Sequence, residues 1–184
     1  MKTTIGIFRG KQATNNKYIL KTLYDTGPLT AWELTKTVRE KNIMSLHAIF
    51  NKRLRLLEKK GYVQKANKKW VLQFKGMIAV LIIQEQPKPW NENWTEIFEN
   101  FVQPITESPK KYTLTADGKE IADFKDFING ILLSVKDFGS WVALADKVKN
   151  LMERGFINLD VISNETLCLL IIKETLFDKK TPFV

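Results

Sequence analysis

The sequence predicts an α+β, mainly α fold, in which an N-terminal unit of three helices and a β-hairpin precedes a largely helical C-terminal domain. Apolar residues recur at helical spacing between residues 46 and 57, so one face of that segment can be buried. Residues 62–72 hold two short apolar runs on either side of a lysine-rich turn, which is typical of a hairpin. Beyond residue 84, two prolines and a reversal of net charge indicate a boundary between the two parts.

The first two helices are predicted from the residues at their ends. One covers about residues 15–25 and stops at Gly27-Pro28, because these residues disfavour continuation of a helix. A second begins at Thr30, since Glu33 three positions later completes a capping box. The side chains expected to face the core are Tyr18, Ile19, Leu23 and Tyr24 in the first helix and Trp32, Leu34 and Val38 in the second.

The third helix is predicted to lead directly into the hairpin. Ser45 can cap this helix, and Gly61 ends it next to two lysines that suit the negative end of the helix dipole. The expected strands are residues 62–63 and 70–72, with residues 66–69 as a basic turn between them. The expected buried stripe of the helix consists of Leu46, Ile49, Phe50, Leu54 and Leu57.

Three helices followed by a two-stranded wing define a winged helix-turn-helix, and residues 15–83 resemble the winged-helix transcription regulators of bacteria and archaea. The most specific parts are Gly27-Pro28-Leu29-Thr30 before the second helix and the run RLRLLEKKGYV from Arg53 to Val63. Residues 72–76, LQFKG, look like the wing-to-fourth-helix junction that is common in archaeal members. The resemblance implies a DNA-binding regulator, although the same fold also serves in protein-interaction modules.

The distribution of charge points to a polyanionic partner. Residues 1–84 contain 17 Lys and Arg against 4 Asp and Glu, whereas residues 85–184 contain 12 against 16. The first half therefore carries the excess that gives the whole chain a net charge of +9 at pH 7. Double-stranded DNA is the predicted partner, because a basic helix fits the major groove of B-form DNA, whereas that of A-form RNA is too narrow.

The predicted DNA contacts lie on the third helix and on the wing. Asn51 can pair with adenine and Arg55 with guanine, while Lys52 is expected to reach phosphate. The full set of expected helix contacts is Ser45, His47, Ala48, Asn51, Lys52 and Arg55, and that of the wing is Lys65, Lys68 and Lys69. The alternative is an interaction module within a larger transcription or repair assembly, in which the basic face docks an acidic protein.

The second half is predicted to be a helical oligomerisation or sensing domain at 87–184, following a DNA-binding domain at 1–86. Residues 76–83 are expected to form a fourth helix, with a strand as the alternative because so short an apolar run has no clear period. Further helices are expected at about 90–102, 117–135, 141–153 (capped by Ser140 after a break at Gly139) and 164–177 (capped by Asn164), with extended pieces at 111–115 and 156–162.

Assembly and internal repetition give two further expectations for the second half. Its helices carry more apolar side chains than a region of this size can easily bury, which predicts a homodimer. Regulators of this type also read paired half-sites as dimers. The run LEKKGYV at 57–63 is echoed by LMERGFI at 151–157, so a degenerate second winged helix is the alternative architecture.

The sequence predicts a protein that is not an enzyme and holds no metal or cofactor. Its single histidine, His47, and single cysteine, Cys168, cannot build a metal cluster or a nucleophilic triad. There is no Walker-type or dinucleotide-type glycine motif. Cys168 lies between leucines and is expected to be a buried thiol. A pocket among Trp90, Trp94 and Trp141 could hold a small-molecule effector, but packed tryptophans are more often core and nothing else in the sequence supports a ligand there.

A membrane location is not expected. The longest apolar run, residues 77–83, is far shorter than the roughly 20 residues that span a bilayer. The first residues, MKTTIGIFRGK, lack the sustained apolar stretch of a signal peptide. The expected location is therefore the cytoplasm.

Overall fold

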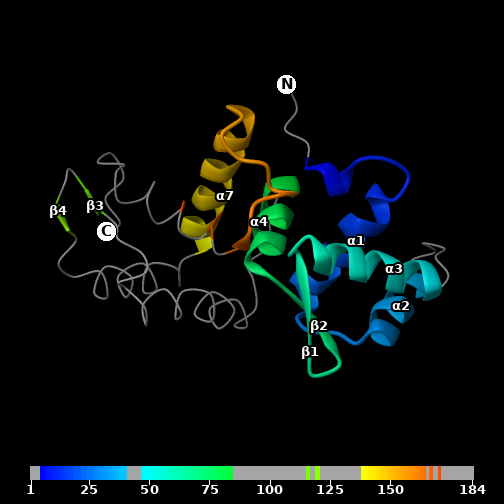
Figure 1. The fold of residues 1–184 in the computed structure, drawn as a ribbon. Coiled ribbons are helices and arrows are strands. Elements are labelled where there is room, and N and C mark those ends of the chain that lie inside the picture. The colour runs from blue at the N-terminus through cyan, green and yellow to red at the C-terminus, as the bar shows by residue number, and fades with distance from the viewer. Residues whose placement is uncertain are drawn as a thin grey trace.

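The structure, a computed structural model, describes residues 5–40, 47–84 and 138–164, together with 115–116, 119–120, 166–167 and 170 (Figure 1). Its described part is α+β and mainly helical, as the sequence predicts. In chain order the elements are η1 (Gly6–Phe8), α1 (Ala13–Thr26), α2 (Ala31–Glu40), α3 (His47–Lys59), β1 (Val63–Ala66), β2 (Lys69–Leu72), α4 (Phe74–Ile83), β3 (Thr115–Ala116), β4 (Lys119–Glu120) and α7 (Phe138–Glu153).

Helix α2 begins with the predicted capping box. The Thr30 amide donates to Glu33 Oε2 at 2.7 Å, and the Glu33 amide donates to Thr30 Oγ1 at 3.2 Å. Leu34 is fully buried as expected, but the prediction for Trp32 is wrong, because its side chain is 66% exposed. Two residues along a helix rotate the side chain by about 200°, so Trp32 and Leu34 face opposite sides. The side chain of Val38 lies outside the described residues.

Helix α3 buries one stripe and ends at a glycine. Phe50, Leu54 and Leu57 are buried as predicted, whereas Ile49 is 39% exposed, which corrects its assignment to the core. Ile49 lies next to Phe50 on the helix, and a one-residue step of about 100° takes it to the edge of the stripe. At the other end, Gly61 adopts a φ of +75°. Leu46, the other residue expected in the stripe, lies outside the described residues.

The hairpin is longer, and its turn tighter, than the sequence predicts. Strands β1 and β2 pair antiparallel, with Val63 opposite Leu72 and Ala66 opposite Lys69. Only Asn67 and Lys68 form the turn between the strands, and both have positive φ, 48° and 66°. Two consecutive residues of positive φ are characteristic of a type I′ turn, which matches the natural twist of paired strands.

The predicted fourth helix is confirmed as α4, and it lies at the centre of the structure. All its residues from Phe74 to Leu81 are buried. Gly76 packs directly against the start of the hairpin, because a Cβ added there would overlap the Tyr62 carbonyl oxygen and the Leu72 side chain. The helix therefore connects the N-terminal helices to the hairpin base without space for a larger residue at this point.

The described part of the second half packs against the first. Helix α7 lies beside α4 in Figure 1, and the two are in extensive contact. Leu144, Val148, Leu159 and Leu167 belong to the same hydrophobic core as residues from η1, α1, α3 and α4. The proposed division of the chain at residue 86 stays a prediction, since most of residues 85–137 lies outside the described part.

Several predictions for the second half are corrected. Helix α7 begins at Phe138, so Gly139 and Ser140 lie inside it and neither breaks nor caps it. Lys119 and Glu120 form a strand paired with Thr115–Ala116, so a helix does not begin at 117. The local reason is that Thr115 pairs with Glu120 and Ala116 with Lys119, so both pairs of residues are extended and cannot belong to a helix.

The segment after α7 also differs from the prediction. Residues 156–162 form turns and irregular backbone, not a strand. Ser163, not Asn164, caps the following helical residues, because its Oγ accepts a hydrogen bond from the Thr166 amide at 3.0 Å. The helix expected at 90–102 and the side chains of Cys168, Trp90, Trp94 and Trp141 lie outside the described residues. Within the described part, no helix has the length and apolar character needed to cross a bilayer.

Candidate nucleic-acid interface

The outward face of α3 presents part of the predicted contact set. Ala48, Lys52 and Arg55 are exposed, and Asn51 is half-buried beside them. Their spacing of three and four residues places them on neighbouring turns of one helical face. His47 is the first residue of α3, but its side chain lies outside the described residues, as does Ser45 altogether. The described residues of α3 thus provide one amide and two cations along a continuous ridge.

The hairpin supplies the second group of cations. Lys65, Lys68 and Lys69 are all exposed. Lys68 occupies the turn itself, and the Nζ of Lys65 lies 5.9 Å from the centre of the Trp70 ring. A lysine over an aromatic face is weakly stabilised by the ring quadrupole, so Trp70 gives Lys65 a preferred position.

Hydrogen bonds fix the hairpin relative to the helices. Leu29, just before α2, exchanges two backbone hydrogen bonds with Trp70, at 3.2 Å and 2.7 Å, and so extends the sheet by one bridge. The Lys65 amide donates to Glu58 Oε1 of α3 at 3.3 Å. Because these contacts reach both α3 and the segment before α2, the hairpin cations are held on the same scaffold as the α3 ridge.

Lys69 of the hairpin also interacts electrostatically with Glu33 at the start of α2. Hydrogen bonds from the backbone and side chain of Thr30 lower the pKa of Glu33, and the nearby Lys69 lowers it further. The start of α2 and the hairpin are therefore electrostatically coupled through Glu33 and Lys69.

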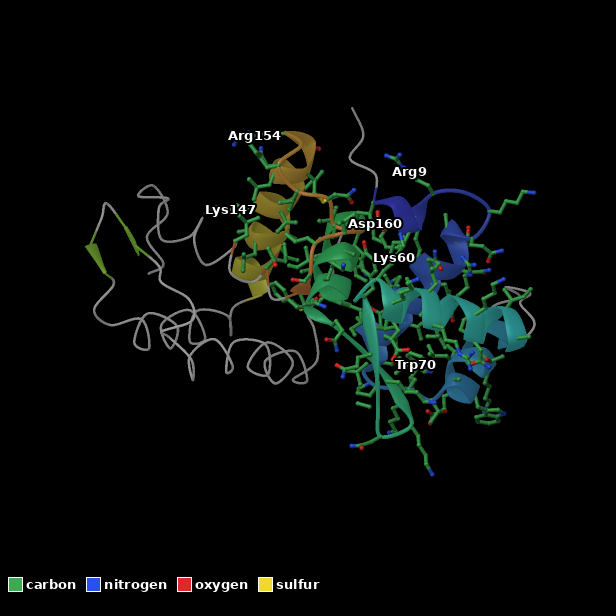
Figure 2. All side chains as sticks on the ribbon, viewed as in Figure 1. Arg9, Lys60, Trp70, Lys147, Arg154 and Asp160 are labelled. Carbon is green, nitrogen blue, oxygen red and sulfur yellow. The ribbon has the colours of Figure 1, made fainter. Side chains whose placement is uncertain are left out.

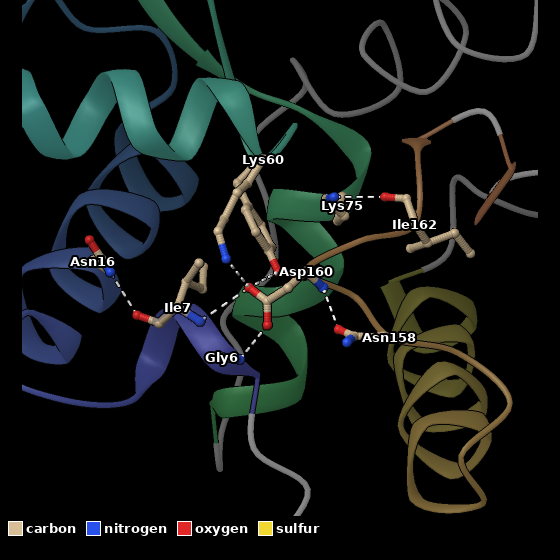
Figure 3. A network of polar contacts seen from close by, with 9 residues as sticks. Gly6, Ile7, Asn16, Lys60, Lys75, Asn158, Asp160 and Ile162 are labelled. Carbon is tan, nitrogen blue, oxygen red and sulfur yellow. Dashed lines mark hydrogen bonds and ion pairs between the residues drawn. The ribbon is translucent and has the colours of Figure 1, made fainter.

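A polar cluster that the sequence does not reveal lies at the C-terminal end of α3, where the chain enters the hairpin. The carboxylate of Asp160 accepts hydrogen bonds from the Gly6 and Ile7 amides, from Lys60 Nζ at 3.3 Å and from the Tyr62 hydroxyl at 3.2 Å (Figure 3). We call these five residues the Asp160 clasp. Figure 2 shows Lys60 and Asp160 close together, away from Trp70 and the hairpin turn. The clasp joins η1, the end of α3 and the segment after α7.

Two buried ionisable side chains lie at the clasp: Tyr62, which belongs to it, and Lys75 beside it. Burial, followed by the charge of Asp160 and its hydrogen bond, raises the pKa of Tyr62 far above its usual range. Lys75 is only 2% exposed, and burial lowers its pKa to about 8. Its Nζ donates to the Ile162 carbonyl oxygen at 2.7 Å and lies 4.9 Å from the centre of the Tyr62 ring.

Asn164 completes the contact between α4 and the second half. Its side-chain oxygen accepts from the Lys75 amide at 2.7 Å, and its side-chain nitrogen donates to the Gly61 carbonyl oxygen at 2.8 Å. These partners are 89 and 103 residues apart in the sequence. No local pattern predicts such contacts, since neither Asp160 nor Asn164 belongs to a recognisable motif.

Among the described residues, no group of three or more His, Cys, Asp or Glu side chains is placed to hold a metal ion. No protein-family model matches the chain, and neither a curated protein nor a solved structure is significantly similar to it.

Proposed function

We propose that the chain binds double-stranded DNA through a winged helix-turn-helix made of α1, α2, α3 and the β1–β2 hairpin. Helix α3 would enter the major groove, and the hairpin would act as the wing. The observation that carries the proposal is that an exposed ridge with Lys52 and Arg55 and an exposed basic turn are joined to one hydrogen-bonded scaffold. A duplex offers phosphates on both sides of its major groove, which such an arrangement can contact together.

The contacts divide into base recognition and backbone positioning. Arg55 can donate two hydrogen bonds to guanine, and Asn51 can pair with adenine. Lys52 and the wing residues Lys65, Lys68 and Lys69 would contact phosphates, which fix the position of the protein but carry little sequence information. Contacts to bases and contacts to phosphates together suit a regulator that recognises particular sites. The proposed biological role is therefore that of a transcription regulator that acts on chromosomal DNA in the cytoplasm.

Selection of bound sequences from random DNA, followed by titration of variants, tests the proposal. Arg55→Ala should weaken binding to the selected site by roughly 1–3 kcal/mol and relax its sequence preference. The pair Lys68→Ala and Lys69→Ala should weaken binding to all DNA similarly and should lower the salt slope by about 1 for each lysine. Lys11→Ala, which removes an exposed lysine ahead of α1, is the matched control and should change neither.

Two results would refute this assignment. If the full-length chain shows no salt-dependent binding to any duplex, the proposed function fails. If the wing variants lose sequence preference while Arg55→Ala retains it, the wing and not α3 reads the bases.

The proposed active form is a homodimer assembled through the second half of the chain. Two copies would present two α3 helices to paired half-sites, which raises affinity through effective concentration. Light scattering of the full-length chain measures the assembly directly. A monomer at the concentrations used for DNA binding would refute the dimeric form, and the selected sequences should then show one half-site only.

A protein-interaction module is the second candidate, and one observation favours it. Trp32 is 66% exposed and Ile49 is 39% exposed, although both are large apolar side chains on α2 and α3. Exposed aromatic residues are enriched in protein interfaces. Stable co-purification with an acidic protein that is lost in Trp32→Ala, in a chain that does not bind DNA, would favour this alternative.

A further inference from the structure

A hollow of about 490 Å³ opens beside the Asp160 clasp, remote from the hairpin turn. It lies between the end of α3, the start of α4 and the segment 160–164. Its polar lining includes the side chains of Lys59, Lys60, Lys75, Asp160, Ser163 and Asn164. The proposed DNA contacts on the hairpin and the exposed face of α3 leave this hollow unused.

Lys75 is the residue that gives the hollow its chemical character. An ammonium group has three donors, and among the described residues the hydrogen-bond acceptor of Lys75 Nζ is the Ile162 carbonyl oxygen. Asp160 is already engaged by four other donors in the clasp. The charge of Asp160 acts on Lys75, but no hydrogen bond joins the two among the described residues. A buried cation with donor capacity to spare therefore lies beside an open hollow, where an anion can accept its hydrogen bonds.

The remaining lining matches an anion of modest size with an apolar part. Lys59 is exposed at the rim and adds a second cation that is free to move toward a ligand. Glu58 also lines the hollow, but its carboxylate accepts the Lys65 amide at 3.3 Å. Leu56 and Ile162 form an apolar part of the wall of the hollow. An organic carboxylate or a phosphate ester would place its head group at the cations and its body against this wall.

We propose that this hollow binds a small organic anion, with Lys75 and Lys59 holding its carboxylate or phosphate group. The bound anion would bridge the start of α4, the end of α3 and the segment 160–164, which are the elements joined by the clasp and Asn164. Ligand binding would therefore stabilise the base of the hairpin. A resulting change in DNA affinity is a consequence that rests on the proposed function, whereas the ligand site does not.

Titration calorimetry of the full-length chain at constant ionic strength tests the site, with inorganic phosphate and benzoate as separate probes. The wild type should bind at least one probe with saturation, and the stronger probe identifies the head group. Lys75→Met should weaken that binding at least about tenfold, because it removes charge-assisted hydrogen bonds to the anion. Lys59→Gln should weaken it about threefold, as expected for an exposed charge. Lys11→Gln, which changes an exposed lysine outside the lining of the hollow, should bind as the wild type.

Three outcomes would overturn the site. One is the absence of saturable binding of both probes to the wild type. Another is wild-type affinity in Lys75→Met, with circular dichroism showing that the variant is folded. If Lys75→Met does not fold, Lys59→Gln decides, and equal affinity of this variant and the wild type refutes the site. Weakening by Lys11→Gln equal to that by Lys59→Gln also refutes it, because the binding is then a general attraction of anions.

Measurement of DNA binding in the same preparations separates the two proposals. A chain that binds a probe through Lys75 but does not bind DNA refutes the proposed function and keeps the anion site. A chain that binds DNA but neither probe refutes the anion site alone.

Discussion

Helices α3 and α7 end in a similar pattern, LEKKGYV at 57–63 and LMERGFI at 151–157, in which a leucine, a glycine and a following aromatic residue take the same places. Both ends have the same backbone geometry. The Tyr62 amide donates to the Leu57 carbonyl oxygen at 2.9 Å, and the Phe156 amide donates to that of Leu151 at 2.9 Å. The two glycines have φ values of +75° and +77°. Each end is therefore a Schellman motif, which a glycine in the left-handed region makes possible.

The chain then continues in two different ways. Tyr62 is fully buried and leads into β1, whereas Phe156 is 64% exposed and leads into turns. The Tyr62 carbonyl oxygen accepts from the Gln73 amide at 3.0 Å, and the next residues form a strand paired with β2. Phe156 instead has Arg154 above its ring at 4.6 Å. The comparison shows that local sequence determines how a helix stops, while a tertiary partner determines the path of the chain beyond the stop.

The largest loss of stability should follow from a substitution at Gly76, the glycine that lets α4 pack closely against the C-terminal end of α3. In Gly76→Ala the new methyl group would overlap the Tyr62 carbonyl oxygen, so the backbone must shift. We expect a loss of about 3 kcal/mol or more in the free energy of unfolding, measured in urea. The control is Gly155→Ala, where no described atom lies within 4 Å of the added Cβ. It should lose only about 1 kcal/mol through its positive φ. Equal losses would mean that tertiary contact does not distinguish the two ends.

An intermediate effect should appear as a pH dependence of stability. Burial lowers the pKa of Lys75 to about 8 from its usual 10.5, so between these pH values the unfolded chain binds the extra proton. Stability should therefore rise with pH from about 8 to 10, on the order of 1–3 kcal/mol. Tyr62 does not oppose this rise, because its ionisation in the unfolded chain begins to matter only near pH 10.

Urea titrations of variants over this pH window check the assignment to Lys75. Lys75→Met should remove the rise, while Arg154→Met at the second helix end should leave it unchanged. A rise that persists in Lys75→Met would place the titrating group elsewhere.

The smallest effect should come from exchanging the aromatic residues of the two ends. Tyr62→Phe removes one of the donors to Asp160 and should cost about 1 kcal/mol. Phe156→Tyr adds a hydroxyl to an exposed ring and should change stability by less than about 0.5 kcal/mol. Thermal unfolding of both variants provides the measurement. If Phe156→Tyr has the larger effect, the exposed ring must have a structural partner in the second half.

The sequence predicts elements well where local chemistry decides them. The capping box of Thr30 and Glu33, the stop at Gly61 and the helix at 76–83 are confirmed because each depends on residues within a few positions. The core-facing direction of Trp32 is wrong, because the step of about 200° to the buried Leu34 turns Trp32 to the opposite side of the helix.

Predictions fail where distant contacts decide the outcome. Residues 156–162 have strand-like composition, yet without a pairing partner they form turns and place Asp160 against η1 and α3. The hydrogen bonds of Asp160 to Ile7 and Lys60 span 153 and 100 residues, so only the folded chain reveals the clasp. Of the candidate DNA contacts, the exposed positions on α3 and the hairpin agree with the predicted pattern, but their role stays a prediction.

The turn at Asn67-Lys68 has a consequence for how this protein would change under selection. Glycine is the residue that best tolerates the second position of such a turn, and a lysine with φ of 66° costs on the order of 1 kcal/mol. Selection for heat tolerance alone should therefore replace Lys68 by glycine. Selection that also demands binding to a polyanion should retain the cation at the tip. The identity of residue 68 in a laboratory evolution experiment would thus report which of the two demands dominates.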